Sequence, residues 1–327
     1  MGKRFLIISI LCYLSSFWGQ AHELRPALLQ IKQTDSIHYS VFWKIPRLGD
    51  KVPGIFVDIP SGQLQASGQP SPTTGYIVYA YELTAPDGIR GKRIGIEGLE
   101  NTLVDALVSI QFLNGEGISL MLQADRTHAK VPEQATTWNV IKTYTILGIE
   151  HILLGFDHLL FVLALVLIIG QFSKLVKTIT AFTLAHSLTL ALVVLGHVSL
   201  PGPPVEAVIA LSIVFLALEI LHLQHGRPTI TRRKPWLVAF TFGLLHGFGF
   251  AGALSDIGLP HGEVPLALGF FNLGVELGQI AFVSVAWLLI QWIPWQRPIF
   301  RPLKKVPAYA IGTLAMFWTL ERIIGMI

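Results

Sequence analysis

The chain has 327 residues, of which 52% are hydrophobic and only 13% are charged. Soluble domains carry roughly 25% charged residues, so this composition excludes a single soluble globule. Residues 1–142 contain 13 of the 24 Lys and Arg residues and 12 of the 20 Asp and Glu residues, so the rest of the chain is mostly apolar. The composition therefore predicts a polar domain followed by a membrane domain. The one cysteine, Cys12, excludes a disulfide framework and a thiolate metal cluster.

The first 21 residues have the pattern of a signal peptide. Lys3 and Arg4 precede a short apolar run at residues 5–14, and Gly19-Gln20-Ala21 forms a small-x-small cleavage site. The run is too short to span a membrane comfortably. We expect the mature chain to begin at His22, whose α-amine and imidazole could then chelate a divalent metal together.

Residues 22–140 are predicted to form a small all-β, sandwich-like extracytoplasmic domain. Apolar and polar residues alternate over seven short segments, at residues 28–32, 37–43, 55–59, 76–83, 93–96, 107–112 and 118–122. Turn signals such as Pro60-Ser61-Gly62 and Asn114-Gly115 separate them. This pattern is typical of an antiparallel sandwich.

Residues 141–327 are predicted to form an α-helical polytopic membrane domain, a bundle of six spans. Apolar runs of spanning length occur at residues 147–170, 175–196, 204–223, 236–257, 264–291 and 306–326. The connections near 171–177, 224–235 and 292–305 contain ten Lys and Arg residues, whereas 197–203 and 258–263 contain none. The positive-inside rule then predicts a bacterial inner-membrane protein with its N-terminal domain and C-terminus in the periplasm. Because topology explains the basic residues, we expect the lipid bilayer, and not a nucleic acid, as a partner.

The predicted spans contain ionisable side chains, which cost at least about 2.5–3.5 kcal/mol at the centre of a bilayer and so usually face a partner or a cavity. Seven residues, close to two helical turns, separate His151 from His158, and Asp157 lies beside them. The remaining candidate metal ligands are His186, Glu206, His246, Glu276 and Gln279. Imidazole and carboxylate without thiolate suit nickel, cobalt, zinc or iron(II) better than copper(I).

The segment from Gly247 to Gly252 satisfies the spacing G-x-G-x-x-G, but it lies inside an apolar run and does not follow a strand. This context excludes a nucleotide site. Gly243 and Gly247 instead form a small-xxx-small pair, which predicts a close approach of two helices.

Residues 148–161, GIEHILLGFDHLLF, resemble the opening signature of the HupE/UreJ membrane proteins. The match continues through residues 182–187, 205–207, 244–252 and 274–279, and it resembles the longer subgroup with an extracytoplasmic N-terminal domain. The resemblance implies a hydrogenase or urease accessory protein that acts as a permease for nickel or a related divalent metal. By this analogy, the metal-handling positions would be His151, Asp157, His158 and His186, with His246 and Glu276 behind them.

The sequence thus predicts a membrane protein that transports or delivers a divalent transition metal, and that is not an enzyme. Glu206 would lie near the outer mouth, and Glu276 and Gln279 would relay the ion inward. A partner in the periplasm or in metalloenzyme maturation would receive or supply the metal. Two alternatives remain: an intramembrane zinc hydrolase, in which the metal activates water, and an interaction module that the spans only anchor.

Overall fold

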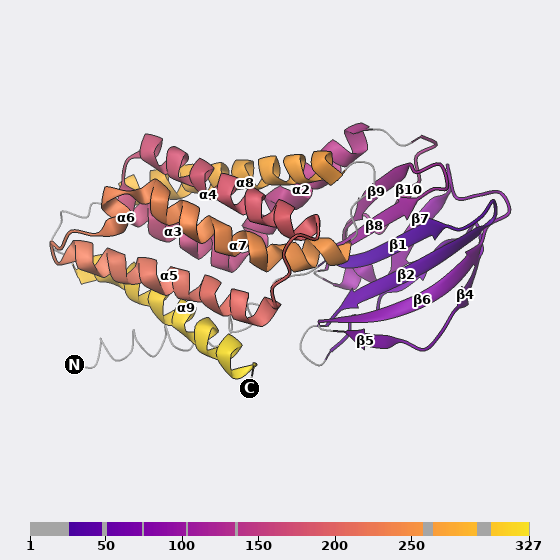
Figure 1. Cartoon of the computed structure of the whole chain (residues 1–327), viewed down its shortest axis with the longest axis horizontal. Coiled ribbons are helices and arrows are strands. Elements are labelled where there is room, and N and C mark those ends of the chain that lie inside the picture. The colour runs from indigo at the N-terminus through magenta and orange to yellow at the C-terminus, as the bar shows by residue number, and fades with distance from the viewer. Residues whose placement is uncertain are drawn as a thin grey trace.

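The computed structural model describes residues 26–47, 51–73, 75–102, 104–134, 137–257, 264–292 and 302–326. The predicted signal peptide, Cys12 and His22 lie outside the described residues. Within them, a β-rich region is followed by a helical region, and Figure 1 shows the two side by side.

The β-rich region contains two sheets. The larger has the order β4-β6-β2-β1-β8-β9, with β5 also paired to β6, and the smaller has the order β10-β7-β3. The strands of the larger sheet are β1 (Ala27–Gln33), β2 (His38–Pro46), β4 (Gln63–Ala66), β5 (Ser71–Thr73), β6 (Tyr76–Thr84), β8 (Ala106–Gln111) and β9 (Gly117–Leu122). Those of the smaller sheet are β3 (Phe56–Asp58), β7 (Arg93–Glu97) and β10 (His128–Lys130), and a short 3-10 helix, η1 (Leu99–Asn101), follows β7.

All seven predicted strands are present, but the expectation of a purely antiparallel sandwich is wrong. β1 pairs with β2 in the antiparallel sense and with β8 in the parallel sense, with Leu29 opposite Val108. Parallel neighbours need a long crossover connection, and here residues 34–105 supply it.

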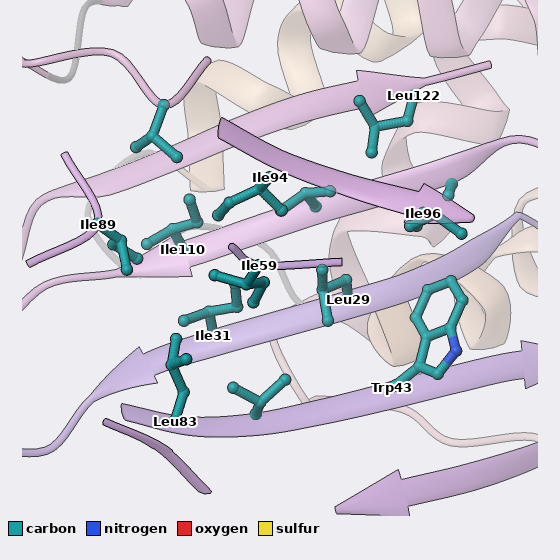
Figure 2. Close-up of a cluster of buried hydrophobic side chains, with 14 of the residues drawn as sticks. Leu29, Ile31, Trp43, Ile59, Leu83, Ile89, Ile94, Ile96, Ile110 and Leu122 are labelled. Carbon is teal, nitrogen blue, oxygen red and sulfur yellow. The ribbon is translucent and has the colours of Figure 1, made fainter. Parts of the chain in front are cut away.

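Alternate residues of the central strands point to opposite faces of the larger sheet. Leu29 and Ile31 of β1 and Trp43 of β2 are at most 1% exposed and face the smaller sheet, where Ile94 and Ile96 of β7 meet them (Figure 2). The Trp43 indole Nε1 donates a hydrogen bond to the Ile55 carbonyl oxygen at 3.3 Å, so this buried ring has its polar atom paired.

The opposite face of the larger sheet packs against the helical region. Leu28 of β1 and Leu107 of β8 share an apolar cluster with Val140 and Tyr144 of helix α2. The Thr143 hydroxyl also donates to the Ser119 carbonyl oxygen at 3.4 Å. The first half of α2 therefore docks the β-rich region onto the helices.

The helical region contains seven longer helices and one short one among the described residues. They are α2 (Thr137–Leu154), α3 (Phe156–Ile169), α4 (Phe172–Val194), α5 (Gly202–Gln224), α6 (Ile230–Arg233), α7 (Pro235–Ile257), α8 (Val264–Trp292) and α9 (Val306–Ile324), with a 3-10 turn, η2 (Pro302–Lys305), before α9. α4 packs mainly against α7, α2 against α8, and α5 against α9.

Three described helices, α4, α5 and α8, are long and apolar enough to cross a membrane. The pair α2 and α3 would count as a fourth span if it is taken as one, although the two helices meet at a bend of 71°. A shorter apolar stretch runs from Pro235 to Gly249 within α7. The first predicted span is therefore broken and not continuous, and the count of six spans stays a prediction.

Two glycine pairs allow helices of this region to pack closely. A Cβ atom added to Gly243 would lie 2.5 Å from the Phe182 carbonyl oxygen, and one added to Gly247 would lie 2.5 Å from the His186 carbonyl oxygen. This contact between α7 and α4 confirms the predicted role of the pair. Gly148 of α2 and Gly274 of α8 make a similar approach.

Candidate metal centre

Four helices of the described region each contribute one histidine to a single cluster. His151 lies in the last turn of α2, His158 near the start of α3, His186 in α4 and His246 in α7. The ring centroids of His151 and His158 are 4.6 Å apart, those of His158 and His246 are 5.2 Å apart, and those of His151 and His186 are 6.2 Å apart. We call these four residues the histidine cluster.

The break between α2 and α3 brings the first two histidines together. In a continuous helix, seven residues would separate them by about 10 Å along the axis. Instead the chain bends at Gly155, where an added Cβ atom would lie 2.5 Å from His158 Nδ1 and 2.7 Å from the His151 carbonyl oxygen. The sequence predicted the proximity of His151 and His158, but from a shared helix face and not from a bend.

The histidine cluster lies in the interior of the helical region. His158 is 5% exposed, and His186 and His246 are each 1% exposed. Phe161 and Phe182 pack against His246 with tilted and edge-on rings, each with a ring centroid 5.1 Å from that of the imidazole. The surroundings are therefore apolar, and little water reaches these rings.

Several ring nitrogens of the cluster have no hydrogen-bond partner among the described residues. They are both nitrogens of His158, Nε2 of His186 and Nδ1 of His246. A buried polar atom that forms no hydrogen bond costs about 1–3 kcal/mol, and most buried polar atoms in proteins have a partner. In each neutral imidazole, the ring nitrogen without a hydrogen can accept a proton or bind a metal ion.

Two further nitrogens of the cluster lie beside neutral side chains from neighbouring helices. His186 Nδ1 lies 3.2 Å from Asn272 Oδ1 of α8, and Asn272 in turn donates to the Leu268 carbonyl oxygen at 2.8 Å. His246 Nε2 lies 3.4 Å from the Ser212 hydroxyl of α5. Outer partners of this kind fix the orientation of metal-binding histidines. Sequence reasoning did not identify Ser212, because a lone serine in an apolar helix gives no signal.

A complete metal site is absent from the described part of the chain, where no three His, Cys, Asp or Glu side chains are arranged to hold one ion. The histidine rings contact one another through their faces and edges. The residue types fit a borderline divalent cation, and ring rotations would be needed to direct their nitrogens at one point.

Two of the predicted carboxylate ligands are instead paired with an arginine. Asp157 Oδ2 lies 2.7 Å from Arg322 Nη2 of α9, and Glu206 Oε2 of α5 lies 3.7 Å from Arg322 Nε. Arg322 Nη1 also donates to the Glu206 carbonyl oxygen at 2.9 Å. Sequence reasoning noted neither contact, because 165 and 116 residues separate the partners.

The last two predicted ligands lie between α4 and α8. Glu276 Oε1 accepts a hydrogen bond from the Thr180 hydroxyl at 2.6 Å, and Gln279 Oε1 accepts one from the Thr183 hydroxyl at 3.1 Å. Gln279 is 1% exposed. Each threonine comes one or two helical turns before His186 on α4, so these polar side chains extend away from the cluster between α4 and α8.

A second polar group occupies the junction with the β-rich region. Gln123 Nε2 donates to Glu150 Oε1 of α2 at 2.8 Å and lies 3.4 Å from Asp105 Oδ2. Burial raises the pKa of Asp105 above its ordinary value. Glu150 directly precedes His151, so this junction contacts the same turn of α2 as the histidine cluster.

A β-rich region is followed by apolar helices that could span a membrane, and histidines are buried among these helices. This combination defines a class of membrane-associated protein with buried polar side chains in an apolar helical interior. The chain belongs to the HupE/UreJ family, because the family described as HupE / UreJ protein matches residues 126–322. The residues before this match form most of the β-rich region, as in the longer subgroup. No curated protein and no solved structure matches the chain.

Proposed function

We propose that this protein handles a divalent transition metal, nickel first, as a membrane-embedded accessory protein for hydrogenase or urease maturation. The observation that carries the proposal is the histidine cluster, with its unpartnered ring nitrogens in an apolar interior. Membership of the HupE/UreJ family supports the same function, since the family is one of accessory and transport proteins.

The metal is the transported ion, and the histidine cluster is its binding site during transport. Neutral imidazole binds nickel, cobalt, zinc and iron(II), and the cluster offers no thiolate that would favour copper(I). Binding would satisfy nitrogens that are otherwise unpaired, which offsets part of the cost of removing water from the ion. Because protonated imidazole cannot bind a metal, uptake should weaken at acid pH.

The orientation follows from the distribution of basic residues. α6, which contains Arg232 and Arg233, lies at the end of the helical region far from the β-rich region (Figure 1). The Gln224 amide donates to the Lys304 carbonyl oxygen at 2.6 Å, so two of the basic connections meet at one end. With six spans and positive residues inside, the β-rich region and the C-terminus lie in the periplasm of a bacterial inner membrane.

The ion would then pass from Asp157 and Glu206 on the outer side to the histidine cluster, and onward past Glu276 and Gln279. Asp157 and Glu206 are near the N-terminal ends of α3 and α5, and Glu276 lies midway along α8. This order uses carboxylates to attract the cation and imidazoles to select it. A maturation partner would take up the delivered metal.

The test is uptake of radioactive nickel by proteoliposomes that contain the full chain. His158→Ala and His186→Ala should reduce uptake to the level of empty vesicles, whereas His197→Ala, at an exposed position outside the cluster, should leave it unchanged. Normal uptake in both cluster variants, at equal reconstitution, would contradict the proposal. A zinc hydrolase would instead retain one tightly bound zinc ion and transport none.

A further inference from the structure

Arg322 lies inside the last predicted span, away from the basic connections, and the proposed function gives it no role. Its guanidinium group lies between the carboxylates of Asp157 and Glu206. The side chains of Arg322 and Asp157 are each 15% exposed, and that of Glu206 is 28% exposed. A charge that is largely buried in a membrane segment costs free energy unless an opposite charge pairs with it, and such charges often mark functional sites.

Two of the three charges lie at helix ends that favour their sign. Asp157 is in the first turn of α3, where the helix dipole stabilises negative charge. Arg322 is in the last turn of α9, where the dipole stabilises positive charge. Glu206 lies just beyond the first turn of α5, so the ion bridge is consistent with the ends of α3 and α9.

We propose that Arg322 is a tethered cation that occupies the Asp157–Glu206 carboxylate pair until a divalent metal ion displaces it. This inference rests on the proposed function, because it says that Arg322 competes with the transported metal ion for the carboxylates of Asp157 and Glu206. Asp157 directly precedes His158, so an ion that replaces the guanidinium group arrives beside the histidine cluster.

The chemistry of the guanidinium group gives this arrangement selectivity for charge. Arginine stays protonated throughout the physiological pH range, so a change of pH does not release it. A monovalent cation brings no more charge than Arg322 and lacks its directed hydrogen bonds. A divalent cation has twice the Coulomb attraction for the same two carboxylates and can therefore compete.

Equilibrium dialysis of radioactive Ni²⁺ against the purified full chain in detergent tests this inference. Arg322→Gln removes the competitor and keeps both carboxylates, so the apparent Kd for Ni²⁺ should fall at least about tenfold, as expected when the free site is a minor state of the wild type. A residue that only stabilises the fold would weaken Ni²⁺ binding when it is replaced.

Two further variants complete the experiment. Arg322→Lys keeps the positive charge, but its ammonium group lacks the planar, bidentate hydrogen-bond geometry of guanidinium. Its apparent Kd for Ni²⁺ should therefore lie between those of the wild type and Arg322→Gln. Arg233→Gln, at an exposed position of α6, is the matched control and should bind Ni²⁺ as the wild type does.

The outcomes distinguish a failure of the role of Arg322 from a failure of the proposed metal-handling function. An apparent Kd of Arg322→Gln equal to or above that of the wild type overturns the role of Arg322. If Arg322→Gln does not fold, an apparent Kd of Arg322→Lys equal to or above that of the wild type overturns it instead. Absence of Ni²⁺ binding in the wild type and in every variant contradicts the proposed function as well.

Discussion

The cores of the two regions differ in their polar content. Between the two sheets of the β-rich region, the core consists of aliphatic side chains with Tyr39, Phe112 and Trp43, and the indole N–H of Trp43 is hydrogen-bonded. In the helical region, buried histidines leave ring nitrogens without a partner among the described residues. Unpaired buried nitrogens cost stability, and the helical region bears this cost where the proposed metal route passes.

The largest effect on stability is expected in the β-rich core. Trp43→Ala should lower the free energy of unfolding by about 3–5 kcal/mol, because it leaves a cavity between the two sheets. Thermal unfolding of the full chain in detergent, followed by circular dichroism, measures the loss. Phe42→Ala, at a neighbouring position that is 44% exposed, should cost far less. Equal losses in the two variants would contradict the assignment of the core.

A smaller loss is expected where α4 and α7 touch. Gly247→Ala places a Cβ atom 2.5 Å from the His186 carbonyl oxygen, so it should separate the helices and cost about 1–3 kcal/mol. Gly269→Ala is the matched control, because nothing lies within 4 Å of an added Cβ atom there. It should be neutral or stabilising by up to about 1 kcal/mol. A stable Gly247→Ala variant would show that the helices do not pack at this distance.

The sharpest contrast between the two regions comes from an apolar replacement in the cluster. His246→Phe places a slightly larger apolar ring beside Phe161 and Phe182 and removes the unpaired nitrogen, so stability should stay the same or rise by up to about 1 kcal/mol. Nickel binding measured on the same sample should be lost. A fall in melting temperature as large as that of Trp43→Ala would mean that His246 is a structural residue.

The smallest effect is expected at the junction between the regions. Burial raises the pKa of Asp105, so stability falls as the pH rises from the ordinary pKa of an aspartate to the raised one, and the full loss remains at higher pH. Asp105→Asn should therefore raise the melting temperature by roughly 1–2 °C at pH 7. The gain should shrink as the pH falls through the raised pKa of Asp105 and vanish below the ordinary pKa of an aspartate, and exposed Asp87→Asn should show no gain. A gain that grows toward acid pH would contradict this account.

The sequence predicted the β-rich region well because alternation is a local signal. β4, β5 and β10 escaped detection, since they have only three or four residues and polar sequences such as Gln63–Ala66. The parallel pairing of β1 with β8 was not predictable, because it depends on which distant strands meet.

The candidate site was predicted in part for the same reason. Ionisable residues in apolar runs identified the histidines, and the structure brings all four together. The bend at Gly155 was not predicted, because a glycine in an apolar run is compatible with a continuous helix. The pairing of Asp157 with Arg322 links residues 165 positions apart, which no local pattern indicates.

X-ray absorption spectroscopy of the nickel-loaded full chain tests the central claim most directly. The account predicts imidazole nitrogen ligands around nickel in the wild type and their loss in the double variant His158→Ala, His186→Ala, with the spectrum of His197→Ala unchanged. Nickel coordinated by oxygen alone in the wild type, or an unchanged imidazole signal in the double variant, would contradict the claim that the histidine cluster binds the metal.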